Sequence, residues 1–201
     1  MLPQYSQYLQ FHLFGVFTEA LDRTKEENEQ FRGLYFRFDY MAGSITLQVD
    51  RKDYENAPAV GSPLWLDGVL RTSSTQRINP QIIEFKPAEQ MPSIEDLQLG
   101  GSVIGPAGLF RQTFVVDGEA RYKCRVTSFG FFREINITQE VYHALPAMPN
   151  QIHLLHGRLT PSREYNKEYG FRTAFDLSIE RLEPFESQRQ RRPRPATAPA
   201  E

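Results

Sequence analysis

Residues 34–40 read Leu-Tyr-Phe-Arg-Phe-Asp-Tyr, and this stretch decides the predicted fold. Its even-numbered positions carry Leu, Phe, Phe and Tyr, while its odd-numbered positions carry Tyr, Arg and Asp. Successive side chains of a strand point to opposite faces, so this alternation predicts a half-buried β-strand. Residues 45–49, Ile-Thr-Leu-Gln-Val, alternate again after Ala42-Gly43, which predicts an antiparallel hairpin.

Further short apolar segments lie on either side of this hairpin at 11–17, 64–70 and 81–85. Turn-rich stretches separate them, and helical periodicity is scarce. Phenylalanine (15) and tyrosine (9) are abundant, which favours strands. The sequence therefore predicts an all-β fold of the sandwich or barrel kind.

The same order of segments recurs about 88 residues later. Residues 122–128 take the place of 34–40. Three pairs of residues keep this spacing to within one residue across two hairpins: Arg37 with Arg125, Tyr54 with Tyr142 and Gly68 with Gly157. Ile83 matches Ile179 at a longer interval. We predict two tandem five-stranded antiparallel β-barrels. Their arrangement is an N-terminal arm (1–10), domain 1 (11–86), a linker (87–99), domain 2 (100–186) and a disordered Arg/Pro tail (187–201).

Two corresponding segments carry a recognisable signature. Residues 60–71 read Val-Gly-Ser-Pro-Leu-Trp-Leu-Asp-Gly-Val-Leu-Arg, and residues 149–160 read Pro-Asn-Gln-Ile-His-Leu-Leu-His-Gly-Arg-Leu-Thr. Both resemble the fourth strand of oligonucleotide-binding (OB) domains in the bacterial single-stranded DNA-binding protein family. The glycine suits a strand that bends tightly around a small barrel. The chain departs from that family in its doubled domain and in ending Arg-Pro-rich rather than in an acidic tip, so partner recruitment is not carried over.

The resemblance implies a ligand groove across the second and third strands of each barrel, where bases stack on rings and phosphates meet cations. Alternation turns Tyr35 and Arg37 outward in domain 1, and Lys123 and Arg125 outward in domain 2. The two arginines fall at equivalent positions, which favours a shared surface. The alternative is that all four are ordinary solvated strand residues.

Two further segments are candidates for binding. Residues 162–170 offer a finger-like loop in which every second residue is aromatic or basic, and the candidates there are Arg163, Tyr165, Lys167 and Tyr169, with Arg172 just beyond. A polar hairpin kept soluble by mixed charge is the alternative. Three phenylalanines surround Gly130, more than a turn can bury, and we assign Phe131 to the binding surface. Core packing and subunit contact remain open for this group.

The sequence favours a binding protein over an enzyme. It lacks a phosphate-binding glycine loop and a Gly-x-Ser-x-Gly motif. One cysteine cannot build a multi-cysteine zinc site, so no metal, catalytic residue or small-molecule cofactor is expected. The single Cys124 and the absence of a long apolar run or signal peptide predict a cytoplasmic protein without a membrane segment.

Charge restricts where a ligand could bind. The net charge is −2. Without the tail, which holds four arginines and one glutamate, 19 basic and 24 acidic residues remain. A phosphate-binding surface must therefore be a local groove. We predict binding of single-stranded DNA, or RNA, with little sequence preference. The alternative is an assembly protein that uses OB-like barrels and exposed phenylalanines for protein contacts and homo-oligomerisation.

Overall fold

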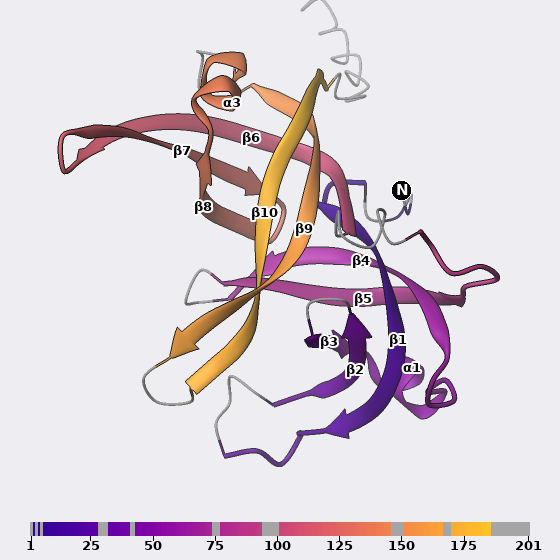
Figure 1. Cartoon of the computed structure of the whole chain (residues 1–201). Coiled ribbons are helices and arrows are strands. Elements are labelled where there is room, and N and C mark those ends of the chain that lie inside the picture. Colours follow the sequence, from indigo (N-terminus) through magenta and orange to yellow (C-terminus); the bar gives the residue numbers. More distant parts are fainter. Residues whose placement is uncertain are drawn as a thin grey trace, which may run out of the picture.

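Alternating segments of the sequence become strands through most of the part of the chain that the structure describes (Figure 1). The computed structural model describes residues 2, 4, 6–27, 32–40, 43–73, 77–93, 101–145, 151–166 and 170–185. Side chains at 40, 43, 163–166 and 170–173 are left out of that description. Within it the chain forms ten strands and two short helices, so the prediction of an all-β fold is confirmed.

The first half contains five strands, and the first and last strands in the order of pairing also pair with each other. The order of neighbours is β1, β2, β3, β5 and β4, and β4 pairs again with β1. The β3–β5 pairing is parallel and the others are antiparallel. The elements of this half are β1 (Gln10–Asp22), β2 (Leu34–Tyr40), β3 (Gly43–Val49), α1 (Arg51–Glu55), β4 (Pro63–Thr72) and β5 (Ile78–Pro87).

The second half repeats this order of elements and most of its pairings. Here β6 pairs with β7 and β9, β7 pairs with β8, and β9 pairs with β10. Strands β8 and β10 contact each other, but no ladder joins them within the described residues. The elements are β6 (Gly101–Val116), β7 (Glu119–Ser128), β8 (Phe131–Ile137), α3 (Gln139–Ala144), β9 (Ile152–Asn166) and β10 (Gly170–Pro184).

A glycine sits where the fourth strand of each half closely approaches the backbone of the last strand. A Cβ atom at Gly68 would lie 2.1 Å from the carbonyl oxygen of Gln81, and one at Gly157 would lie 2.3 Å from that of Ser178. No side chain fits in that space. This explains in physical terms why the sequence signature places glycine at both positions.

Each glycine also adjoins a bulge on the last strand of its half. The β4–β5 ladder shifts register beside Gly68, and the β9–β10 ladder shifts beside Gly157. In this register Ile82 faces Gly68 as Ile179 faces Gly157. The predicted equivalence of Ile83 with Ile179 is therefore wrong by one residue. Both last strands carry the bulge at the same place, and the bulged residue Ile83 corresponds to Glu180.

The two halves join edge to edge through β1 and β6. Phe11 pairs with Val103, Gln10 with Ile104 and His12 with Ser102, all antiparallel. Phe11 faces the glycine of β4 and Val103 faces that of β9, so the central pair joins equivalent positions. The register is thus symmetric about this pair, and β5, β4, β1, β6, β9 and β10 form one continuous sheet.

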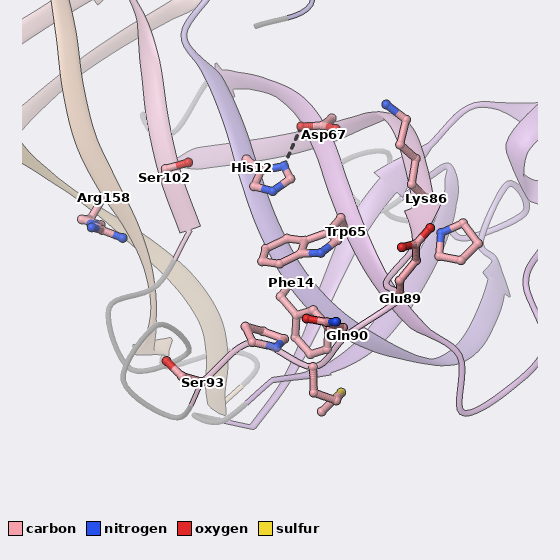
Figure 2. A pocket seen from close by; sticks show the side chains of 13 residues that line it. His12, Phe14, Trp65, Asp67, Lys86, Glu89, Gln90, Ser93, Ser102 and Arg158 are labelled. Atoms are coloured by element: carbon pink, nitrogen blue, oxygen red, sulfur yellow. Dashed lines mark hydrogen bonds and ion pairs between the residues drawn. The ribbon is translucent and has the colours of Figure 1, made fainter.

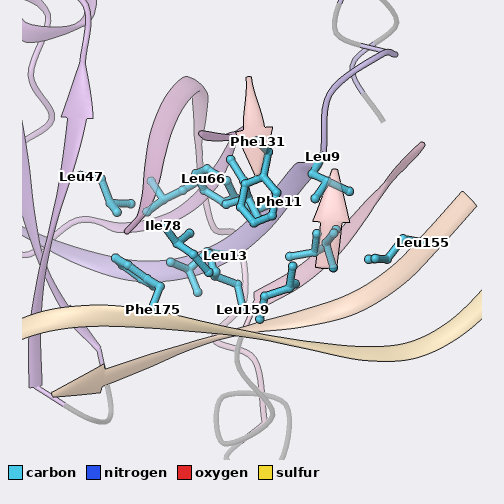
Figure 3. Close-up of a cluster of buried hydrophobic side chains, with 14 of the residues drawn as sticks. Leu9, Phe11, Leu13, Leu47, Leu66, Ile78, Phe131, Leu155, Leu159 and Phe175 are labelled. Carbon is cyan, nitrogen blue, oxygen red and sulfur yellow. The ribbon is translucent and has the colours of Figure 1, made fainter. Parts of the chain in front are cut away.

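The hydrophobic core also continues from one half into the other (Figure 3). Phe11 and Leu66 from the first half belong to the same buried cluster as Phe131 and Leu159 from the second. Strand β10 contacts β3 and β5 and contributes Phe175, which is 5% exposed. A buried phenylalanine or leucine contributes about 1.5–3 kcal/mol, so this shared cluster holds the halves in a fixed arrangement.

Candidate nucleic-acid interface

The outer face of β6, β7 and β8 carries alternating aromatic and basic side chains. Cys124 and Val126 of β7 are fully buried, so the intervening Lys123 and Arg125 point outward. Strand pairing fixes their neighbours. Arg125 lies between Phe110 of β6 and Glu134 of β8, while the next outward residue of β7 lies opposite Phe132.

Cations lie over the rings on this face. The Arg125 guanidinium carbon is 5.8 Å from the centre of the Phe110 ring and 5.5 Å from that of Phe132. Toward the β6–β7 turn, the Lys123 Nζ is 4.9 Å from the Phe114 ring. Phe110 is 42% exposed and Phe132 is 39% exposed, so both rings remain open to a ligand. We call Phe110, Phe114, Phe132, Lys123 and Arg125 the aromatic track.

The charge of Arg125 is partly neutralised by its neighbour. One terminal nitrogen of Arg125 donates to the Glu134 carboxylate at 2.9 Å, and the two side chains are 39% and 32% exposed. The Arg125 Nε is buried and has no hydrogen-bond partner among the residues that the structure describes. Glu134 therefore holds the guanidinium close to the two rings.

The first half presents a different arrangement at the corresponding strands. Arg37 pairs across β1 and β2 with Glu19 at 2.6 Å. Tyr35, half-buried, lies under the Arg23 guanidinium at 6.0 Å, and burial raises the pKa of its hydroxyl. The structure thus brings predicted Lys123 and Arg125 together on the track and leaves predicted Tyr35 and Arg37 on the other half.

The assignment of Phe131 to the binding surface is wrong. Its side chain is only 2% exposed and belongs to the core. Phe131 shares its face of β8 with Ile135, which is 6% exposed, whereas Phe132 points outward. The alternation of β8 decides between the two neighbours, and the exposed phenylalanines at this turn are Phe132 and Phe129.

The predicted finger forms part of a long hairpin. Strand β9 continues to Asn166 and β10 begins at Gly170. The backbones of Arg163, Tyr165 and Arg172 lie in these strands, but their side chains fall outside the described residues, as do Lys167 and Tyr169 altogether. Their role in binding stays a prediction.

The spacing of the sequence did not reveal Phe110 and Phe114 as part of this surface. Both lie on β6, which pairs with β7 through a two-residue turn at Asp117-Gly118. Both turn residues have positive φ, 52° and 81°. An Asp-Gly pair between alternating segments is a strong hairpin signal, and it would have placed Phe110 opposite Arg125.

A hollow of about 880 Å³ lies on the outer face of the continuous sheet (Figure 2). His12 stacks on Trp65 with ring centres 4.5 Å apart, and its Nδ1 is 2.8 Å from an Asp67 carboxylate oxygen. Ser102 lies opposite His12 on the neighbouring strand. The Asp67 carboxylate and the Trp65 ring orient the His12 ring.

The described part of the chain offers no cluster of three or more His, Cys, Asp or Glu side chains suited to a metal ion. In the same ranges, no helix has the length and apolar character needed to cross a membrane. The rings and charged groups of the track are suited to stacking, ion pairing and hydrogen bonding.

The fold and the face described above define a β protein with an exposed aromatic and basic surface. No family model matches the chain, and no curated protein matches it significantly in sequence. A solved structure is similar: a deletion mutant of the single-stranded DNA-binding protein from Thermus aquaticus, with 13% identity and a TM-score of 0.50. The match covers 90% of this chain and 97% of that one. It supports an OB-like fold for the chain.

Proposed function

We propose that this protein binds single-stranded nucleic acid without enzymatic activity, through two OB-like barrels in tandem. Single-stranded DNA is the first ligand to test, since the similar solved structure is named as a protein that binds it. The observation that carries the proposal is the aromatic track, where exposed Phe110 and Phe132 flank Arg125. Bases stack on such rings whatever their sequence, so the proposed binding has little sequence preference.

The acidic body does not conflict with this proposal. Binding depends on the local field, and β7 places Lys123 and Arg125 two residues apart on one face. Each stacked base contributes about 1–3 kcal/mol, so two rings supply a substantial part of a micromolar affinity. The phosphate contacts add a term that weakens with salt.

Fluorescence anisotropy of a labelled oligothymidine tests the proposal. We expect binding at micromolar protein in low salt, weaker binding as salt rises, and little binding to a duplex of equal length. Replacing Lys123 and Arg125 by Ala should flatten the salt dependence. The control removes Lys86 and Arg181, two exposed cations away from the track, and changes net charge equally. Absence of binding to the wild type in low salt would overturn the proposal.

A second candidate function is protein assembly, favoured by exposed apolar side chains. Phe129 is 55% exposed at the β7–β8 turn, and Val115 is 71% exposed near the tip of the β6–β7 hairpin. Such groups suit contacts between subunits. A defined oligomer by light scattering, together with no binding to nucleic acid, would select this function.

A further inference from the structure

The first half holds the β7–β8 turn, at one end of the aromatic track, in place. The backbone N–H of Thr72, at the end of β4, donates to the Gly130 carbonyl oxygen at 3.1 Å. The N–H of Phe132 donates to the Thr72 hydroxyl at 2.9 Å. These two bonds fix the position of the β7–β8 turn relative to β4.

At this junction the first half adds another aromatic and cationic pair. The ring of Tyr8 lies 4.8 Å from that of Phe129 at an angle of 77°. The Arg71 guanidinium carbon lies 5.9 Å from the Tyr8 ring. Arg71 is exposed, and the edge-on contact with Tyr8 leaves Phe129 55% exposed. Simple packing of two halves does not need an open ring beside an exposed cation.

The new pair continues the sequence of rings along β7. From Arg125 the chain advances three residues to the end of β7 at Ser128 and one more into the turn at Phe129, a span of at most about 14 Å. Over that distance Phe110 and Phe132 are followed by Phe129 and then Tyr8. The alternation of ring and cation thus extends past the end of the second half onto the first.

We propose that Tyr8 and Arg71 form a further subsite for the same strand of nucleic acid, so that one ligand contacts both halves. This inference rests on the proposed function. A short oligonucleotide fills the track around Arg125, and only a longer one passes the β7–β8 turn and reaches Tyr8. At the junction a base stacks beside Phe129 and Tyr8 while Arg71 meets a phosphate.

The test measures the dissociation constants of an oligothymidine series spanning about 4–16 nucleotides, the range of OB site sizes. We compare wild type with a Tyr8→Leu, Arg71→Gln double variant. Short ligands should bind both proteins equally. A longer oligonucleotide should bind more tightly than a short one, and this gain in affinity should be about 5- to 150-fold smaller in the variant than in the wild type. That difference equals the loss of one stacked base.

A matched control exists away from both the track and the junction. The Arg111 guanidinium carbon lies 5.0 Å from the Tyr142 ring, so a Tyr142→Leu, Arg111→Gln variant removes the same chemistry and charge elsewhere. It should keep the wild-type dependence on length. Thermal unfolding monitors the fold of each variant, and Arg71→Gln alone replaces the double variant if that one unfolds.

The possible outcomes separate the two proposals. If wild type binds no oligonucleotide, the proposed function fails. Suppose instead that the wild type binds and that replacing Phe110 and Phe132 weakens binding. If the Tyr8 and Arg71 variant then still gains as much affinity as the wild type from a longer oligonucleotide, only the junction subsite is overturned. Equal loss of that gain in the Tyr142 and Arg111 control would also overturn the subsite, because the effect would then not be specific to the junction.

Discussion

Glu134 stands beside the central cation of the proposed binding face, and its removal should strengthen binding. Its carboxylate lies 2.9 Å from Arg125, so a phosphate at this arginine is about 5 Å from a like charge. Coulomb's law gives a repulsion of about 0.8 kcal/mol in water at that distance, and several times more where water is partly excluded. Glu134→Gln keeps an oxygen that accepts from Arg125 and removes the charge.

We therefore expect Glu134→Gln to bind an oligothymidine about 4- to 10-fold more tightly in low salt. The gain should diminish as salt rises, since screening weakens exposed charges. Anisotropy titrations at several salt concentrations measure both effects. Glu180→Gln is the control, because Glu180 forms a similar pair with Arg158 at 2.8 Å on β9 and β10. Equal gains in both variants, or weaker binding by Glu134→Gln, would refute the reasoning.

Three further predictions concern packing and reactivity. Gly68→Ala should destabilise the fold strongly, since its Cβ would lie 2.1 Å from a carbonyl oxygen, whereas Gly108→Ala, with 3.8 Å of space, should be tolerated; thermal unfolding compares them. Phe131→Ala should cost about 3–5 kcal/mol of stability by chemical denaturation, while Phe132→Ala should chiefly weaken oligonucleotide binding. Burial raises the pKa of the Cys124 thiol to about 11, so it should resist alkylation at pH 8 until the protein is unfolded, and rapid labelling of the native protein would contradict this.

Local alternation predicted the strands well because burial on one face imposes it. The segment 34–40 is β2, with Phe36 and Phe38 fully buried and Arg37 facing outward. The glycines at 68 and 157 mark equivalent positions, where backbone approach excludes a side chain. These features depend on neighbouring residues, and the sequence displays them directly.

Features created by contacts between distant strands were harder to predict. Phe110 becomes part of the track only through the β6–β7 register, and Arg71 meets Tyr8 only through the folding of β4 beside the N-terminal segment. The pairing of β1 with β6, which joins the halves, has no local signature. The wrong assignment of Phe131 could have been avoided from the sequence alone. Phe131 and the apolar Ile135 lie four residues apart and therefore on the same face of β8.

Mapping a photochemical cross-link tests the central claim most directly. An oligothymidine carrying 5-iodouracil is bound to the full chain, irradiated and located by mass spectrometry. Stacking on the exposed rings predicts adducts on Phe110, Phe132 and Phe129. Adducts confined to Tyr35 or to the Trp65 hollow, or no adduct from a bound complex, would contradict binding along the β6–β7–β8 face.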